Sequence, residues 1–275
     1  MESRGTEYRA RPVSPAVTPG AGRQPRLFTR RFGPPPRPGG PVMVLVHGLG
    51  LSGRYFVPLA RRLAAGGASV LVPDLPGHVR SRALVRRVPD TEGLAAALAR
   101  WLDRAAPGPV HLVANSVGCQ VAVALAARYP RAVRSLVLIG PALDPGTPSP
   151  WRQGGRLLAD VPREPLGLLA LATADYLVTG PVRFAAAFRH ARRYAAGPFE
   201  RHLARVGAPT LVVRGADDPL APRSWTEHAA RLLRHGRTAV VPGAAHAAHY
   251  SAPATVAALV TDFTNGATPP GGEDA

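Results

Sequence analysis

The chain has 275 residues and is 46% hydrophobic, which is enough for one large α/β domain with an insertion or for two small domains. Its formal net charge of +17 raises the question of a nucleic-acid partner. All of its basic residues are arginines, as codon bias in a GC-rich genome produces, and they form no tight cluster interleaved with aromatic residues, so we expect no nucleic-acid partner.

The first half of the chain alternates between predicted strands and helices. Residues 1–26 carry Arg, Pro, Gly and Ser without an apolar period, and we expect a disordered tail. A short edge strand is expected within 27–40. Further predicted strands are 42–46, 70–72, 110–113 and 133–139, and the predicted helices are 53–66, 91–105 and 117–129. Continuous apolar runs such as 42–46 are typical of strands that are buried on both faces of a parallel sheet.

The second half resumes this alternation after an interruption. Residues 144–206 contain helical segments and no clear strand, so we predict a helical lid there. Strands at 210–213 and 238–241 and helices at 222–235 and 254–264 follow, before a polar, flexible tail at 266–275. The pattern predicts an α/β fold with a mostly parallel sheet flanked by helices on both faces, built from residues 27–143 and 207–265.

A serine stands where the predicted strand 110–113 meets the next helix. In Ala114-Asn115-Ser116-Val117-Gly118, small residues lie two places before and two places after Ser116. A sharp strand-to-helix turn needs small flanking residues and lifts the serine hydroxyl above the sheet. Ser116 is therefore a candidate nucleophile, and a serine that only caps an ordinary helix is the alternative.

Three other segments agree with this interpretation. They are Val44-Leu45-Val46-His47-Gly48-Leu49-Gly50, Gly215-Ala216-Asp217-Asp218-Pro219 and Pro242-Gly243-Ala244-Ala245-His246, each at or just after a predicted strand. Together with the serine turn they resemble the α/β-hydrolase superfamily over about residues 27–265. The resemblance implies that fold, with a helical lid, and the activity of a serine hydrolase.

The resemblance also implies roles for individual residues. The order Ser116, Asp218, His246 is the chain order of the catalytic residues in this fold. His246 would take the serine proton, and Asp218 would hold the imidazole. The backbone N–H groups of Leu49 and Val117 would form an oxyanion hole. Some members place the acid after an earlier strand, and Asp144 is then the alternative to Asp218.

The sequence departs from the family pattern at a few positions. Ala114 stands for the first glycine of the serine turn and Ala245 for the glycine before His246. In the structural loop that begins at Asp74, Val79 replaces a second glycine. These changes lie at supporting positions, so catalysis remains the expectation.

The remaining histidines and the cysteine have structural interpretations. We expect His47 to support the oxyanion turn, His78 to belong to the loop after Asp74, and His249 to lie at the surface or at the rim of the site. Cys119, the single cysteine, excludes an internal disulfide and suits a reducing compartment. We expect it to be a small buried packing residue, with a redox-sensitive thiol as the alternative.

No cofactor is expected. The sequence shows no His, Cys, Asp or Glu group with metal-ligand spacing, so we predict no metal site. The string Gly48-Leu49-Gly50-Leu51-Ser52-Gly53 fits a dinucleotide fingerprint, but it lacks an acidic partner in the expected region. No segment has the roughly 18 apolar residues of a membrane helix. We therefore expect a cytoplasmic protein without stable membrane insertion.

The function predicted from the sequence is a serine hydrolase that forms an acyl-enzyme on a small or medium carboxylic ester or a related acyl compound. A C–C bond hydrolase of vinylogous diketo acids is the alternative on the same fold, because Asn115-Ser116 resembles part of the motif of that group. The alternative from another class is a ligand-binding or regulatory protein that turns over slowly.

Overall fold

The computed structural model describes residues 26–146 and 149–266. The two predicted tails lie outside these residues, apart from Arg26 and Gly266. Within these residues a sheet of seven strands forms the centre, in the order β1-β3-β2-β4-β5-β6-β7, with β1 antiparallel to β3 and the other pairs parallel. The strands are β1 Thr29–Phe32, β2 Val42–Val46, β3 Ser69–Pro73, β4 Val110–Asn115, β5 Val133–Ile139, β6 Thr210–Gly215 and β7 Gly236–Val241. The mostly parallel sheet predicted from the sequence is confirmed.

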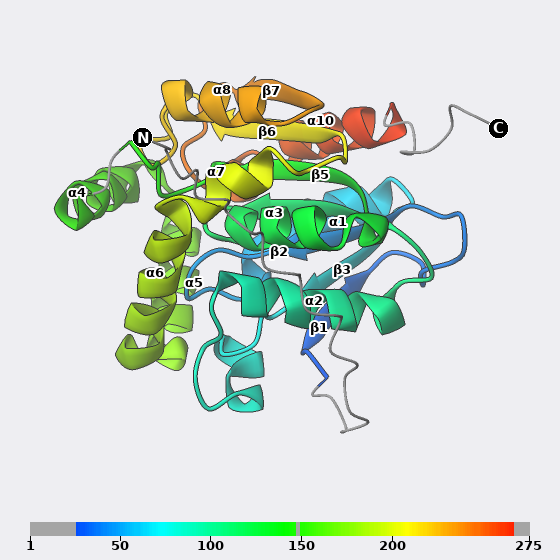
Figure 1. The fold of residues 1–275 in the computed structure, drawn as a ribbon, viewed down its shortest axis with the longest axis horizontal. Helices are drawn as coiled ribbons and strands as arrows, with labels where there is room; N and C mark the ends of the chain where they lie inside the picture. The colour runs from blue at the N-terminus through cyan, green and yellow to red at the C-terminus, as the bar shows by residue number, and fades with distance from the viewer. Residues whose placement is uncertain (1–25, 147–148, 267–275) are drawn as a thin grey trace, which may run out of the picture.

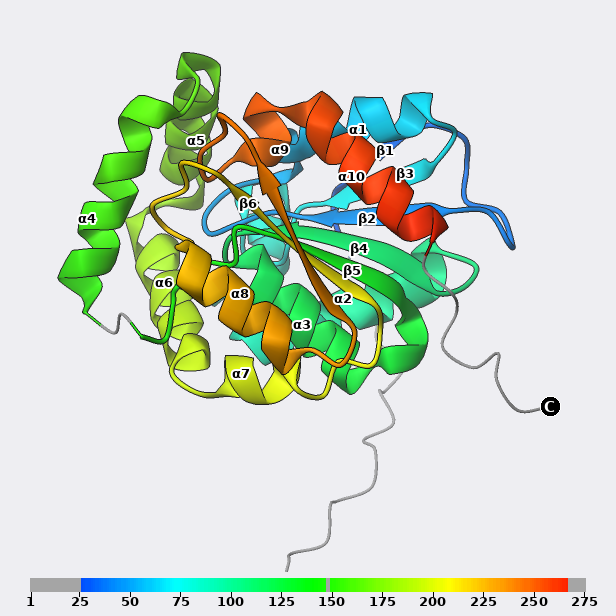
Figure 2. The ribbon, with the colours of Figure 1, turned by 90° about the horizontal axis from the view of Figure 1, so that it is seen from above.

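Helices cover both faces of the sheet (Figure 2). On one face lie α2 (Thr91–Ala105), α3 (Gly118–Arg128) and α8 (Arg223–Leu232), and on the other lie α1 (Val57–Ala65), α9 (Ala248–Ser251) and α10 (Pro253–Asn265). Short 3₁₀ turns stand at Gly53–Phe56, Val79–Leu84, Pro130–Ala132 and Val161–Arg163.

Strand β2 shows why continuous apolar runs form the centre. Its side chains alternate between the two faces, so that Val42, Val44 and Val46 enter one hydrophobic cluster and Met43 and Leu45 enter the other. All five are buried because helices cover both faces.

The described residues between β5 and β6 form four helices, which we call the inserted helices. They are α4 (Pro150–Asp160), α5 (Leu166–Thr179), α6 (Pro181–Ala195) and α7 (Pro198–Leu203). Helices α4, α5 and α6 project from one end of the molecule, whereas α7 packs beside α3 and α8 (Figures 1 and 2). No helix within the described part of the chain combines the length and the apolar character needed to cross a membrane.

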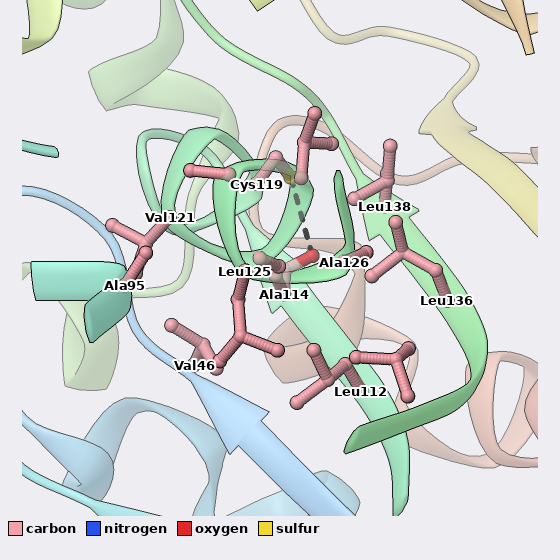
Figure 3. Close-up of a cluster of buried hydrophobic side chains, with 14 of the residues drawn as sticks. Val46, Ala95, Leu112, Ala114, Cys119, Val121, Leu125, Ala126, Leu136 and Leu138 are labelled. Carbon is pink, nitrogen blue, oxygen red and sulfur yellow. Dashed lines mark hydrogen bonds between the residues drawn. The ribbon is translucent and has the colours of Figure 1, made fainter. Parts of the chain in front are cut away.

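Cys119 lies inside the cluster between α3 and the sheet (Figure 3). Its thiol donates a weak hydrogen bond to the carbonyl oxygen of Ala114 at 3.4 Å. Burial raises the pKa of this thiol well above its usual value. The thiolate that reacts with oxidants is thereby disfavoured, which supports the packing role over the redox role.

Candidate active site

Ser116 occupies a strained turn between β4 and α3. Its φ is +59°, a left-handed value that is unusual for a residue with a side chain. The following helix passes very close to β2, because a Cβ at Gly118 would lie 2.5 Å from the carbonyl oxygen of Val46 and 2.6 Å from that of His47. Only glycine fits there, and this close approach turns the chain so that Ser116 and Val117 stay partly exposed.

His246 and Asp218 meet at the same edge of the sheet, on the turns after β7 and β6. Nδ1 of His246 lies 3.0 Å from Oδ2 of Asp218. The other carboxylate oxygen of Asp218 accepts hydrogen bonds from the N–H groups of Leu220 at 2.8 Å and Ala221 at 3.0 Å. A Cβ at Gly140 would come within 2.8 Å of that Oδ2, so glycine at the end of β5 leaves room for the pair.

The contact between these two residues shifts the pKa of each. Burial opposes the charged form of His246, but the Asp218 carboxylate outweighs burial and the pKa of His246 rises to about 9. Burial likewise opposes the charge of Asp218, and His246 with the backbone N–H donors holds its pKa below the usual value. The pair therefore favours an ionised carboxylate that keeps the imidazole oriented.

The structure brings His246 to Asp218 and not to Asp144. Asp144 instead accepts a hydrogen bond from the N–H of Gly146 and lies 3.6 Å from a guanidinium nitrogen of Arg156. Nε2 of His246 is buried and has no hydrogen-bond partner among the described residues, so it does not bond the Ser116 hydroxyl in this structure. Such contacts often tighten only when substrate is bound.

The turn after β2 lies against Ser116. A Cβ at Gly48 would be 3.2 Å from the Cβ of Ser116. The N–H groups of Leu49 and Val117 donate to no other backbone group of the described residues. His47 fixes this turn, because its Nδ1 donates to the Gly48 carbonyl and its Nε2 accepts the N–H of Leu75, each at 2.9 Å. Burial lowers the pKa of His47, which suits this neutral form.

The side chain of Asn115 connects the serine turn to the histidine turn. Its buried side-chain amide donates to the carbonyl oxygens of Ile139 and His246, each at 3.1 Å. The amide therefore holds the backbone of the histidine turn beside the serine turn.

Two carboxylates contact the histidine turn, Asp160 at the end of α4 and Glu164 just after the following 3₁₀ turn, and sequence reasoning missed both. Asp160 accepts the N–H of His246 at 3.3 Å, and Glu164 accepts the N–H of Ala247 at 2.6 Å. Both side chains are buried, and burial is the main reason that the pKa of Glu164 rises to about 7. Their negative charges add to the raised pKa of His246.

A third missed carboxylate, Asp175 of α5, contacts the turn after β2. Its Oδ2 accepts the N–H of Ser52 at 2.9 Å and the Ser52 hydroxyl at 2.6 Å. Thr179, one turn further along α5, donates to the carbonyl oxygen of Gly50 at 2.9 Å. Asp160, Glu164 and Asp175 are the acidic residues of 149–199 in an arginine-rich chain. The small number of acidic residues in this segment is the one feature of the sequence that points to them, and it does not reveal which groups they contact.

Helix α6 lies near the two candidate oxyanion donors. A cavity of about 20 Å³ beside them is lined by Leu49 and Val117 and by Ala187 and His190 of α6. This volume holds about one water molecule. Leu49, Ser116 and Val117 are themselves partly exposed, so this side of the serine is narrow but open to solvent.

The prediction that His249 lies at the surface or at the rim is wrong. Its ring is fully buried between Tyr55 and Phe56, with ring centroids 4.3 Å from each. Burial lowers the pKa of His249 well below its usual value, so the ring is neutral. His78 is also buried, and its pKa falls to about 3.

Comparisons with known proteins place this geometry in context. A family model described as the alpha/beta hydrolase family matches residues 43–259. A pimeloyl-[acyl-carrier protein] methyl ester esterase of Neisseria meningitidis is 30% identical over 81% of this chain and 93% of its own length. A 2-hydroxy-6-oxononadienedioate/2-hydroxy-6-oxononatrienedioate hydrolase of Pseudomonas putida is 30% identical over 67% of this chain and 73% of its own length. A hydrolase structure from Oleispira antarctica superposes with a TM-score of 0.72 at 15% identity, over 88% of this chain and 95% of that one.

Proposed function

Because this chain belongs to the alpha/beta hydrolase family, we propose that it is a serine hydrolase that cleaves a small or medium carboxylic ester, or a related acyl compound, through an acyl-enzyme. One observation carries the proposal. The His246–Asp218 pair stands at the same sheet edge as the strained Ser116 turn. A strained serine beside an oriented imidazole is the arrangement that nucleophilic catalysis needs.

In the proposed reaction, Ser116 attacks the substrate carbonyl while Nε2 of His246 takes the hydroxyl proton. The histidine then returns this proton to the leaving alcohol. Water next attacks the acyl-enzyme while His246 takes its proton, and the histidine passes a proton to Ser116 as the acid leaves. Asp218 holds the imidazole and stabilises its cationic form. The N–H groups of Leu49 and Val117 bind the developing oxyanion, and each such donor is worth about 3–4 kcal/mol in comparable hydrolases.

The inserted helices would act as a lid over this site. Support comes from α6, which lines a small cavity together with Leu49 and Val117. It also comes from the buried carboxylates Asp160, Glu164 and Asp175, which connect the inserted segment to both sides of the site. A lid of this kind excludes water from the oxyanion and strengthens its hydrogen bonds.

A fluorophosphonate probe tests the proposal, because it labels only an activated serine. We expect labelling of the wild type, loss of labelling in Ser116→Ala, and full labelling in Ser224→Ala, which removes an exposed serine of α8. Turnover is then followed on p-nitrophenyl esters of graded chain length. A folded wild type that takes no label and hydrolyses no ester would support the slow ligand-binding protein instead.

C–C bond hydrolysis is the second candidate. The Pseudomonas putida relative and Asn115 before the serine favour it. In this structure, however, the Asn115 side chain is buried and its amide nitrogen bonds two backbone carbonyl oxygens, which favours a structural role over contact with the substrate. A ring-fission diketo acid assayed beside the esters separates the two reactions, since faster turnover of the diketo acid would replace ester hydrolysis as the proposed function.

A further inference from the structure

Helix α4 exposes its apolar side and buries its polar side, which reverses the usual arrangement of a surface helix. Gln153 and Asp160 are buried on the side that faces the protein. Trp151 and Leu158, seven residues apart and therefore on one side of the helix, are 88% and 73% exposed. The exposed apolar side chains of α4 contribute no burial free energy while they face water.

Helix α5 is apolar on nearly all sides, so that it packs Leu168 into the core and still exposes other apolar residues. Leu166, Ala170, Thr173 and Leu177 follow helical spacing along its exposed side, and the only charged residue of α5, Asp175, is buried. Among the described residues, ten large hydrophobic side chains are exposed, and eight of them fall within 151–182. The apolar exposure is thus concentrated on α4, α5 and the start of α6, at one end of the molecule (Figure 1). We call these exposed side chains the apolar face: Trp151, Leu157, Leu158, Val161, Leu166, Leu177, Val178 and Val182.

The charges around the apolar face have a single sign. Residues 149–199 contain seven arginines and three acidic residues. All three acids are buried at the site, whereas the arginines are exposed or partly exposed. Arg152, Arg163 and Arg189 are examples from α4, the following turn and α6. The surface of the inserted helices therefore offers apolar side chains bordered by positive charge.

We propose that the apolar face is a membrane-docking surface, which lies flat on a bilayer that contains anionic lipids. Exposed Trp and Leu enter the boundary between headgroups and acyl chains, as they do in interfacial helices, while neighbouring arginines contact the lipid phosphates. The formal charge of +17 attracts the whole chain to such a surface. Docking is peripheral, because α5 has 14 residues and is too short to cross a bilayer.

This surface places the bilayer next to the helices that cover the candidate site. The inferred docking does not depend on hydrolysis, however, and binding to vesicles tests it directly. Flotation with phosphatidylglycerol vesicles, with phosphatidylcholine vesicles as the neutral comparison, measures the bound fraction. Trp151 gives an internal probe, because Trp101 and Trp225 are 7% and 3% exposed and are shielded from lipid.

We expect the wild type to float with phosphatidylglycerol vesicles, with a blue shift of Trp151 emission, and to stay unbound with phosphatidylcholine. Leu158→Ser combined with Leu177→Ser keeps every charge and removes two apolar contacts. It should weaken binding at least about tenfold. Val240→Ser, which changes an exposed apolar residue of β7, is the matched control and should bind like the wild type.

Two results would overturn the proposal. If the double variant floats as well as the wild type, charge alone causes binding and the apolar face has no part in it. If the wild type does not float and instead sediments as a dimer that the double variant dissociates, a second copy of the chain covers the apolar face. Thermal unfolding of each variant establishes that it is folded.

Discussion

The sheet edge and the inserted helices place their apolar and polar residues in opposite ways. At the sheet edge, buried strands such as β2 form the core, and the candidate chemistry projects from their ends. In α4 and α5, apolar residues face water, and the buried polar side chains reach down to the site. The sheet edge therefore holds the candidate reactive groups on a buried support, whereas the inserted helices present an apolar outer surface.

The largest expected effect lies at the sheet edge. Asp218→Asn removes the charge that orients His246 and should lower kcat about 10⁴-fold while the fold persists. Asp144→Asn is the matched control, because Asp144 pairs with Arg156 and not with His246. Steady-state kinetics on a processed ester compare the two. Equal losses in both variants would remove Asp218 from the proposed mechanism.

The next effect contrasts packing in the two regions. Leu136 of β5 is fully buried, and Leu136→Ala should lower the free energy of unfolding by about 2–5 kcal/mol. Leu158→Ala on α4 should change it by less than about 0.5 kcal/mol, because that side chain is exposed. Urea denaturation measures both. A large loss in the second variant would mean that α4 packs against protein in solution.

Asp175 tests how the inserted helices are joined to the site. Asp175→Ala leaves the buried N–H and hydroxyl of Ser52 without their acceptor, at a cost of about 1–3 kcal/mol in unfolding free energy. The turn that carries Leu49 also loses its support, so kcat should fall more than KM changes. Asp175→Asn, which keeps an acceptor oxygen, should recover part of both. Unchanged kinetics in a folded Asp175→Ala would separate α5 from the oxyanion turn.

Glu164 gives a smaller effect that depends on pH. As the pKa of His246 is raised to about 9, the neutral base forms only as pH approaches that value, and kcat/KM should rise with pH up to it. Glu164→Gln keeps an acceptor for Ala247 but removes a negative charge near His246. The rising part of the profile of kcat/KM against pH should then move to lower pH by roughly half to one unit. Glu227→Gln, which changes a carboxylate on the outer side of α8, should leave the rising part of the profile in place.

The same residue links pH to stability. The pKa of Glu164 rises from 4.5 to about 7 on folding, so between these values the folded state binds more protons than the unfolded state. The Glu164 contribution to the free energy of unfolding therefore falls as pH rises through this window. Glu164→Gln lacks this loss. The unfolding temperature of the variant minus that of the wild type should therefore be larger at pH 8 than at pH 4.5. The same difference in unfolding temperature at both pH values would contradict a raised pKa of Glu164 in the folded state.

Several elements follow from local sequence alone. The helix at 91–105 and the strand at 133–139 have the predicted bounds, because apolar periodicity and clear end signals act within a few residues. The helix expected at 53–66 begins as a 3₁₀ turn, and its α-helical part starts at Val57. Element ends depend on caps and on neighbouring loops, so they are harder to predict than the elements themselves.

The candidate site divides in the same way. Ser116, Asp218 and His246 stand in short turns after strands, and the carboxyl ends of parallel strands lie at one edge of a sheet. His249 was misplaced because nothing nearby in sequence indicates that Tyr55 and Phe56 enclose it. Asp160, Glu164 and Asp175 were missed for the same reason, since their partners lie 83 to 123 residues away.

Local patterns in the sequence were enough to predict the alternation of strands and helices, the family and the three turns that carry the candidate triad, because these depend on periodicity and turn chemistry within short segments. The folded chain was needed to show which acid meets His246 and that the acids of the inserted segment are buried. It was also needed to show that α4 turns its apolar side outward and that α5 leaves apolar side chains exposed. The periodicity of a helix indicates that it has two sides, but only the packing of the whole chain selects the side that is buried.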